Sequence, residues 1–196
     1  MVLYADDVLK KAPGSTIIGD VKCSQRLFDA IKEMGGKPIM WKTGHSLVKR
    51  KLKEEGAMLA GEMSGHIFFK ENFYGFDDAP YCAARLASIV SNMEGKISGY
   101  FAKIPAMHST PEIRVDCPEE LKFKITEAAK DAFSDYEVDT TDGARISFED
   151  GWGLVRASNT QPVLVMRFEA SSAEKLSEYE KIVRSKIQEI TSSLKA

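Results

Sequence analysis

Two short stretches of the sequence combine residue types that could bind a polar ligand. The first, residues 61–66 (GEMSGH), places a carboxylate (Glu62), a hydroxyl (Ser64) and an imidazole (His66) between two glycines. Glycine permits positive φ and close backbone approach, which a loop around a small ligand requires. If the stretch forms a turn, the three side chains converge on one polar object, and the hydroxyls of a sugar suit that mixture of acceptors and donors. A tight strand connection with incidental polar residues is an equally good interpretation of the spacing alone.

The second stretch, residues 156–162 (RASNTQP), is rich in hydrogen-bond donors. It combines the guanidinium of Arg156 with the hydroxyls of Ser158 and Thr160 and the amide of Asn159. Such a set suits a phosphate, because an arginine can donate to two oxygens at once while backbone N–H groups of the loop complete the cradle. The alternative is an ordinary hairpin loop with a surface arginine.

The elements that precede and follow the first stretch alternate in the βαβ manner. Buried-strand patterns occur at residues 15–21, 37–41 and 57–60, and helical periodicity occurs at 24–34 and 46–55, with Ser46 as the expected N-cap. A further helix is expected after Asp78. In open α/β sheets, ligands bind outside the carboxyl ends of the strands. Three polar groups follow these strand ends and are expected to share one site: Lys22, His45 and the loop from Glu62 to His66.

The second half of the chain has a different order of expected strands and helices. Strand-like pieces occur at residues 111–115, 136–139, 144–148, 153–156 and 162–168. Possible capping boxes at Asp116/Glu119 and Ser171/Glu174 open two expected helices. Residues 95–110 lack helical periodicity, so we place a domain junction there and expect domains at 1–100 and 101–196. The expected fold class is α/β plus α+β: a βαβ-type mixed-sheet domain, followed by a smaller antiparallel-sheet domain packed with helices.

Composition narrows the functional classes. The 196 residues are 43% hydrophobic and 29% charged with a net charge of −2, which gives no support to a nucleic-acid or membrane-surface role. No apolar run is long enough to span a membrane, and no signal peptide is evident. The 3 cysteines are scattered, as expected for reduced thiols in a cytoplasmic protein. No metal site is expected, because no cysteine, histidine or aspartate spacing matches a metal loop.

Five motifs together resemble the α-D-phosphohexomutase family, and most of all its bacterial phosphomannomutase/phosphoglucomutase branch. They occur in the family's order over nearly the whole chain: VKCS at 21–24, WKTGHS at 41–46, GEMSGH at 61–66, GFDD at 75–78 and GWGLVRASNTQP at 151–162. The family fold has four domains around a deep cleft, and this sequence is similar only to the third and fourth.

The resemblance implies roles for the residues of both stretches. Glu62 and Ser64 would hold sugar hydroxyls, and His66 would assist proton transfer near the reacting oxygen. Lys22 and His45 would line the cleft. The phosphate that is not transferred would be bound by Arg156, Ser158, Asn159 and Thr160. The ligands implied are mannose and glucose 1- and 6-phosphates.

The family's reacting groups do not occur in these 196 residues. The family transfers phosphate through a serine in a TASHNP-type motif and holds Mg²⁺ with a DGDxDR-type loop, and both belong to its first two domains. The sequence is therefore expected to be a fragment or a natural half of a mutase. It would have no cofactor of its own and no activity until N-terminal domains are supplied in cis or in trans. Mg²⁺ and glucose 1,6-bisphosphate are expected only for the full-length enzyme.

Two alternatives remain open at this point. One is a non-catalytic module that binds hexose phosphates. The other is a fragment of a phosphoglucosamine mutase, although Met63 and Asn159 favour the mannose/glucose branch.

Overall fold

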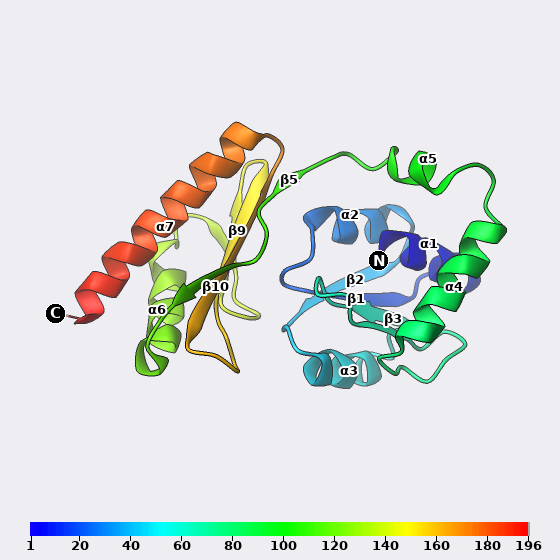
Figure 1. Cartoon of the computed structure of the whole chain (residues 1–196), viewed down its shortest axis with the longest axis horizontal. Helices are drawn as coiled ribbons and strands as arrows, with labels where there is room; N and C mark the ends of the chain where they lie inside the picture. Colours follow the sequence, from blue (N-terminus) through cyan, green and yellow to red (C-terminus); the bar gives the residue numbers. More distant parts are fainter. Residues whose placement is uncertain (196) are drawn as a thin grey trace. The chain divides into compact units, whose positions relative to one another are not determined.

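The computed structural model describes residues 1–195, and the chain divides into two compact units, Met1–Pro105 (unit 1) and Ala106–Ala196 (unit 2). Each unit has its own sheet and its own hydrophobic core (Figure 1). The expected fold class is confirmed, since a mixed sheet is followed by an antiparallel one packed with helices.

Unit 1 is built on a mixed sheet with strand order β2-β1-β3-β4. The central strand β1 pairs in parallel with β2 and β3, whereas β4 returns antiparallel to β3. The strands are β1 (Thr16–Asp20), β2 (Lys37–Trp41), β3 (Leu59–Gly61) and β4 (Ile67–Phe69). Because β1, β2 and β3 run in the same direction, their carboxyl ends lie at one edge of the sheet.

Helices cover both faces of this sheet, as adjacent strand residues show. Ile17 belongs to the core formed with α1 and α2, whereas Ile18 packs with Val48 and Leu52 of α3 on the other face. The helices are α1 (Val2–Lys11), α2 (Gln25–Glu33), α3 (His45–Glu54), α4 (Ala79–Ser91) and α5 (Ile97–Phe101). Sequence patterns did not reveal α1 or the short α5.

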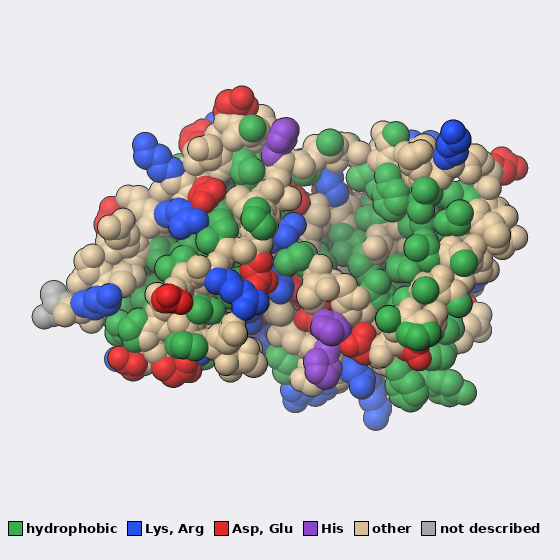
Figure 2. Space-filling view, in the orientation of Figure 1, with side chains coloured by type: hydrophobic (Ala, Val, Ile, Leu, Met, Phe, Trp, Pro, Cys, Tyr) green, Lys and Arg blue, Asp and Glu red, His purple; other side chains and the backbone are tan. Residues whose placement is uncertain are grey.

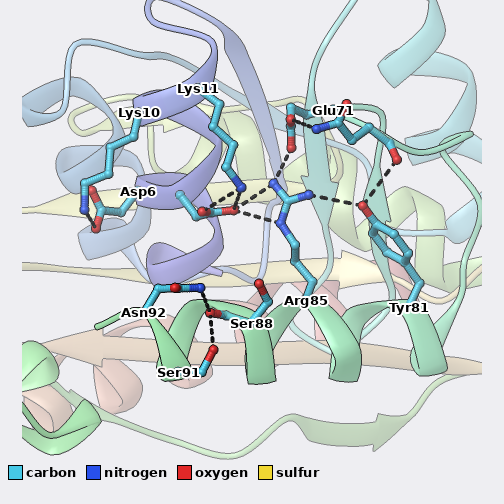
Figure 3. A network of polar contacts seen from close by, with 11 residues as sticks. Asp6, Lys10, Lys11, Glu71, Tyr81, Arg85, Ser88, Ser91 and Asn92 are labelled. Atoms are coloured by element: carbon cyan, nitrogen blue, oxygen red, sulfur yellow. Dashed lines mark hydrogen bonds and ion pairs between the residues drawn. The ribbon is translucent and has the colours of Figure 1, made fainter. Parts of the chain in front are cut away.

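A network of charged groups joins α4 to the rest of unit 1 (Figure 3). Arg85 donates to Asp7 of α1 at 2.8 Å, to Glu71 after β4, and to the Tyr81 hydroxyl at 3.2 Å. Burial alone would lower the pKa of Arg85, but the hydrogen bonds to Glu71 and Asp7 outweigh it and raise the pKa. The guanidinium is therefore charged and holds two carboxylates together, which fixes the loop after β4.

Unit 2 contains an antiparallel sheet with the order β5-β10-β9-β8-β7, and β6 also pairs with β10. The strands are β5 (His108–Ser109), β6 (Ile113–Asp116), β7 (Glu137–Asp139), β8 (Ala144–Phe148), β9 (Gly151–Ala157) and β10 (Val163–Ala170). Within residues 95–110, where the sequence predicted a domain junction, His108 of β5 pairs with Ala170 of β10.

Helices α6 (Glu119–Ala132) and α7 (Ala173–Lys195) pack side by side against the sheet of unit 2 (Figure 1). The core between helices and sheet includes Ile125, Ile146, Leu164, Phe168 and Val183. No helix within residues 1–195 is both long enough and apolar enough to cross a membrane.

Three helix caps differ from those predicted. Gly44, not Ser46, is the N-cap of α3. The N-cap of α6 is Pro118, with no side-chain cap, because Asp116 is still paired with Val163 in the sheet.

At α7 it is the Ser172 hydroxyl that accepts from the Lys175 N–H at 3.2 Å. The Ser171 hydroxyl is instead hydrogen-bonded to Asp150. In each of these cases a tertiary contact competes with the local capping pattern.

Candidate functional site

The carboxyl edge of the unit 1 sheet brings together most of the polar groups that the sequence indicated. Lys22 follows β1, His45 begins α3 after β2, and residues 62–66 connect β3 to β4. The imidazole rings of His45 and His66 lie with their centroids 5.9 Å apart, and Figure 2 shows neighbouring histidine side chains at the surface. The edge of one sheet thus gathers residues that are more than 40 positions apart in the sequence.

Residues 62–66, the acidic loop, form a tight hairpin connection. The Glu62 N–H donates to the His66 carbonyl at 2.9 Å, and the Gly65 N–H donates to the Glu62 carbonyl at 3.0 Å. Gly65 has a φ of 99°, which residues with a side chain rarely adopt. Ser64 is therefore exposed at the tip, while Glu62 points inward. The stretch is a tight strand connection that also contains a buried acid, and convergence of its three polar side chains on a ligand stays a prediction.

Glu62 is the most informative side chain of the loop, because it is only 4% exposed. Its Oε1 accepts the Gly44 N–H at 2.6 Å, at the N-terminus of α3, where the helix dipole favours an anion. Its Oε2 is buried and has no hydrogen-bond partner within the described residues. A buried polar atom without a partner costs about 1–3 kcal/mol, so this oxygen is suited to accept a hydrogen bond from a ligand.

A buried aspartate, Asp20, holds three loops of unit 1 together, and sequence reasoning missed it. It is fully buried and accepts from the Met63 N–H at 3.0 Å, from the Thr43 hydroxyl at 3.0 Å and from the Cys23 thiol at 3.1 Å. Burial and the nearby Asp20 raise the pKa of the Cys23 thiol well above its usual value, which keeps the thiol a neutral donor. Lys22 lies beside it, with its Nζ 4.0 Å from Asp20 Oδ2.

His66 is oriented by a second residue whose role was not predicted, Asp77. Its Nδ1 lies 2.6 Å from Asp77 Oδ2, and both side chains are partly exposed, at 47% and 36%. When Nδ1 donates to the carboxylate, the neutral imidazole presents Nε2 as an acceptor. The GFDD motif contained Asp77, but its contact with His66 required the fold.

The second set of predicted residues lies between β9 and β10 in unit 2, in residues 156–161, the arginine loop. Arg156 lies near the end of β9 opposite Val165, is 5% exposed, and donates its Nε–H to Asp142 Oδ2 at 2.9 Å. Asp142 thereby fixes the guanidinium plane. The Nη1 and Nη2 groups have no hydrogen-bond partner among residues 1–195 and so could donate together to an anion.

The loop hydroxyl of Ser158 organises the backbone that follows. It accepts the N–H groups of Thr160 at 3.3 Å and Gln161 at 3.2 Å, so these two amides are directed into the loop and not toward a ligand. This limits the backbone cradle that the sequence suggested. Asn159 and Thr160 are exposed, whereas Ser158 is 7% exposed and keeps its own hydroxyl proton for donation.

No metal site is evident in the part of the chain that the structure describes. Within residues 1–195, no three histidine, cysteine or carboxylate side chains lie close enough to hold an ion. The residues present therefore do not fit the Mg²⁺ that the resemblance implies for the full-length family enzyme.

Both units of the chain match domains of a known protein family. Residues 1–107 match the family described as phosphoglucomutase/phosphomannomutase, alpha/beta/alpha domain III, and residues 112–186 match its C-terminal domain. The phosphomannomutase/phosphoglucomutase of Pseudomonas aeruginosa is 50% identical over 196 residues, a match that covers 99% of this chain and 42% of that protein.

Two solved structures show the same fold. A phosphoglucomutase/phosphomannomutase family protein from Burkholderia thailandensis aligns with a TM-score of 0.88 and 44% identity over 97% of this chain and 41% of its own. An N-acetylphosphoglucosamine mutase of Aspergillus fumigatus, solved in complex with glucose 1,6-bisphosphate, aligns with a TM-score of 0.65. It is 14% identical over 96% of this chain and 42% of its own, so the likeness is one of fold.

The chain spans about two fifths of the length of these relatives. The matches extend over both units and include both candidate loops. On this evidence the chain belongs to the phosphoglucomutase/phosphomannomutase family.

Proposed function

We propose that this chain binds hexose phosphates and positions them for phosphoryl transfer in a phosphomannomutase/phosphoglucomutase. Unit 1 contributes the contacts to sugar hydroxyls, and unit 2 contributes the contacts to the phosphate that is not transferred. The observation that carries the proposal is the buried Glu62 Oε2, which has no protein partner within the described residues and lies in the part of the chain that matches the family's domain III. Mannose and glucose phosphates are the ligands, as the names of the relatives suggest.

Within unit 1, the acidic loop acts as an acceptor of hydrogen bonds. Glu62 receives one sugar hydroxyl at Oε2 while Gly44 holds Oε1 in place. The exposed Ser64 hydroxyl can accept or donate, which suits a sugar that binds in two orientations. The exposed His45 lies at the same sheet edge, where the buried Lys22 follows β1.

His66 is the candidate acid–base group of the chain. The Asp77 carboxylate holds Nδ1 at 2.6 Å, so Nε2 is the atom that takes or returns a proton on a reacting hydroxyl. The same carboxylate stabilises the imidazolium after the proton has been taken.

Within unit 2, the arginine loop acts as a donor. Arg156 is oriented by Asp142 and offers Nη1 and Nη2 to two phosphate oxygens, which is the bidentate geometry that guanidinium groups favour. The hydroxyls of Ser158 and Thr160 and the amide of Asn159 add further donors.

The reacting groups are proposed to come from other domains of a mutase, in cis or in trans. Phosphoryl transfer needs a phosphate carrier and neutralisation of charge, and neither the serine motif nor the metal loop of the family occurs in these 196 residues. Glucose 1,6-bisphosphate, the ligand in the Aspergillus structure, is the expected bisphosphorylated ligand of the complete enzyme.

A complementation experiment tests the proposal. The purified chain is titrated with glucose 1-phosphate by NMR, and mutase activity is measured alone and with the separately expressed N-terminal part of the Pseudomonas relative. We expect binding no tighter than about 10⁻⁴ M, since two separately ordered units lose entropy on binding, no turnover by the chain alone, and turnover in the mixture.

The control for the complementation is Arg156→Ala in the same mixture, which should reduce turnover. Conversion of mannose 1-phosphate by the chain alone would contradict the proposal that the reacting groups come from other domains. Binding without turnover in the mixture would identify a hexose-phosphate-binding module instead.

A further inference from the structure

A lysine of α6 that no motif includes, Lys122, lies directly beneath the arginine loop. Its side chain is 1% exposed, and its Nζ donates to the Ser158 carbonyl at 2.5 Å and to the Gln161 carbonyl at 3.1 Å. It also pairs with Glu119 Oε1 at 2.7 Å. Burying an ammonium group is costly unless its donors are satisfied, and here they are satisfied by the two loop carbonyls and Glu119.

The two carbonyl contacts fix the orientation of the loop peptides. In a trans peptide the C=O and the next N–H point in opposite directions. Because the Ser158 carbonyl points at Lys122, the Asn159 N–H points away from it, on the exposed side of the loop. The Gln161 carbonyl is held in the same way, and the next residue, Pro162, has no N–H to present.

The Asn159 N–H is the backbone donor that this arrangement leaves for a ligand. The N–H groups of Thr160 and Gln161 are already bonded to the Ser158 hydroxyl, and that of Ser158 donates to the Val163 carbonyl at 3.0 Å. The Asn159 N–H has no hydrogen-bond partner among the described residues. A cation on the carbonyl of the same peptide also polarises this N–H and makes it a stronger donor to an anion.

From these contacts we infer that Lys122 is a positioning residue for the phosphate-binding loop, which orients and polarises the Ser158–Asn159 peptide so that the Asn159 N–H donates to the ligand phosphate. The inference rests on the proposed function for its ligand, but the peptide orientation can be measured without one. Lys122 is 1% exposed and bonded to the loop carbonyls, so we expect its effect to pass through the loop.

The experiment compares Lys122→Met with Lys124→Met in the full 196-residue chain. Lys124 is exposed on the same helix, so its substitution removes an equal charge without touching the loop. The first readout is the ¹H–¹⁵N resonance of Asn159, and the second is the Kd for inorganic phosphate and for glucose 1-phosphate by NMR titration.

We expect Lys122→Met to shift the Asn159 resonance and to weaken binding of both ligands by about tenfold, as for loss of a hydrogen bond to a charged group. Lys124→Met should leave the Asn159 resonance unshifted. It should change the Kd for either ligand by less than about a factor of two. Ile125→Val, a core change on α6, controls for lost stability and should leave Kd unchanged. Lys122→Arg, which keeps a buried cation, should recover part of the affinity.

If Lys122→Met does not fold, Lys122→Gln serves in its place, since its amide can still donate to one carbonyl. The same shift of Asn159 and a Kd raised at least about threefold are then expected. An unshifted Asn159 resonance in Lys122→Met or Lys122→Gln overturns the inference, and so does an unchanged Kd in a chain that binds phosphate. A wild-type chain that binds no phosphate overturns the proposed function, while the Asn159 resonance still decides the role of Lys122.

Discussion

The acidic loop of unit 1 and the arginine loop of unit 2 are both hairpin connections, but they have opposite hydrogen-bonding character. In the acidic loop, Glu62 keeps a buried oxygen that lacks a donor within the described residues. In the arginine loop, the Arg156 Nη groups and the Asn159 N–H are donors that have no acceptor among residues 1–195. One loop is therefore suited to hydroxyls and the other to an anion.

The two loops are also held in place differently. The acidic loop is held from the side by the buried carboxylate of Asp20, which accepts the Met63 N–H. The arginine loop is held from beneath by the buried ammonium of Lys122, which donates to two carbonyls. In each case a buried charge bonds the backbone of the loop. Asp20 bonds an N–H, and the group left for the ligand is an acceptor, Glu62 Oε2. Lys122 bonds carbonyls, and the group left for the ligand is a donor, the Asn159 N–H. Substitutions on either side test this contrast.

The largest effect is expected from Arg156→Ala. Loss of a bidentate donor to a dianion should weaken binding of inorganic phosphate by at least about 10- to 100-fold, because even one hydrogen bond to a charged group contributes about 1.5–3 kcal/mol. The Kd is measured by NMR titration. Arg184→Ala removes an exposed arginine of α7 that pairs with Glu180 and should leave the Kd unchanged. Equal phosphate affinities of wild type and Arg156→Ala would contradict the assignment of the arginine loop as the anion-binding loop.

Glu62→Gln should weaken ligand binding and stabilise the folded chain. An amide NH₂ cannot accept the sugar hydroxyl that Oε2 accepts, so the affinity for glucose 1-phosphate should fall about tenfold. The free energy of unfolding should rise by about 1 kcal/mol, because a buried carboxylate is replaced by a neutral amide, which costs less to bury.

Calorimetric titration and urea unfolding measure these two quantities for Glu62→Gln. Glu54→Gln, an exposed change on α3, is the matched control for both. A less stable variant with unchanged affinity would show that Glu62 is only a structural residue.

The smallest effect is expected from Asp77→Ala. The Asp77 carboxylate can only accept, so it favours the tautomer with the proton on Nδ1; without it, the neutral His66 ring should become a mixture of its two tautomers. Because both side chains are partly exposed, the unfolding free energy should change by less than about 1 kcal/mol. Ring ¹⁵N shifts report the tautomer, with His45 as the internal reference. An unchanged tautomer of His66 would show that Asp77 does not orient the ring.

Sequence patterns predicted the regular elements better than the contacts at their ends. Strands 37–41 and 144–148 occur as expected, because alternation and flanking glycines are local signals. The predicted caps at Ser46 and Asp116 were wrong, because a strand pairing or a loop contact from elsewhere decides where a helix begins. The helix at residues 2–11 was missed; the buried pairs Tyr4/Val8 and Ala5/Leu9 lie at helical i, i+4 spacing and could have indicated it.

The sequence by itself determined the family, the two kinds of loop and the types of group that each contains. Glu62, His66 and Arg156 were indicated by their neighbours in the chain, since a motif is a local property. The tertiary structure alone decided how these groups are held. Asp20 contacts a residue 43 positions away, and Lys122 contacts one 36 positions away. Such buried charges leave no local signal, because the loop groups that they bond, the Met63 N–H and the Ser158 and Gln161 carbonyls, are backbone atoms, which every residue has.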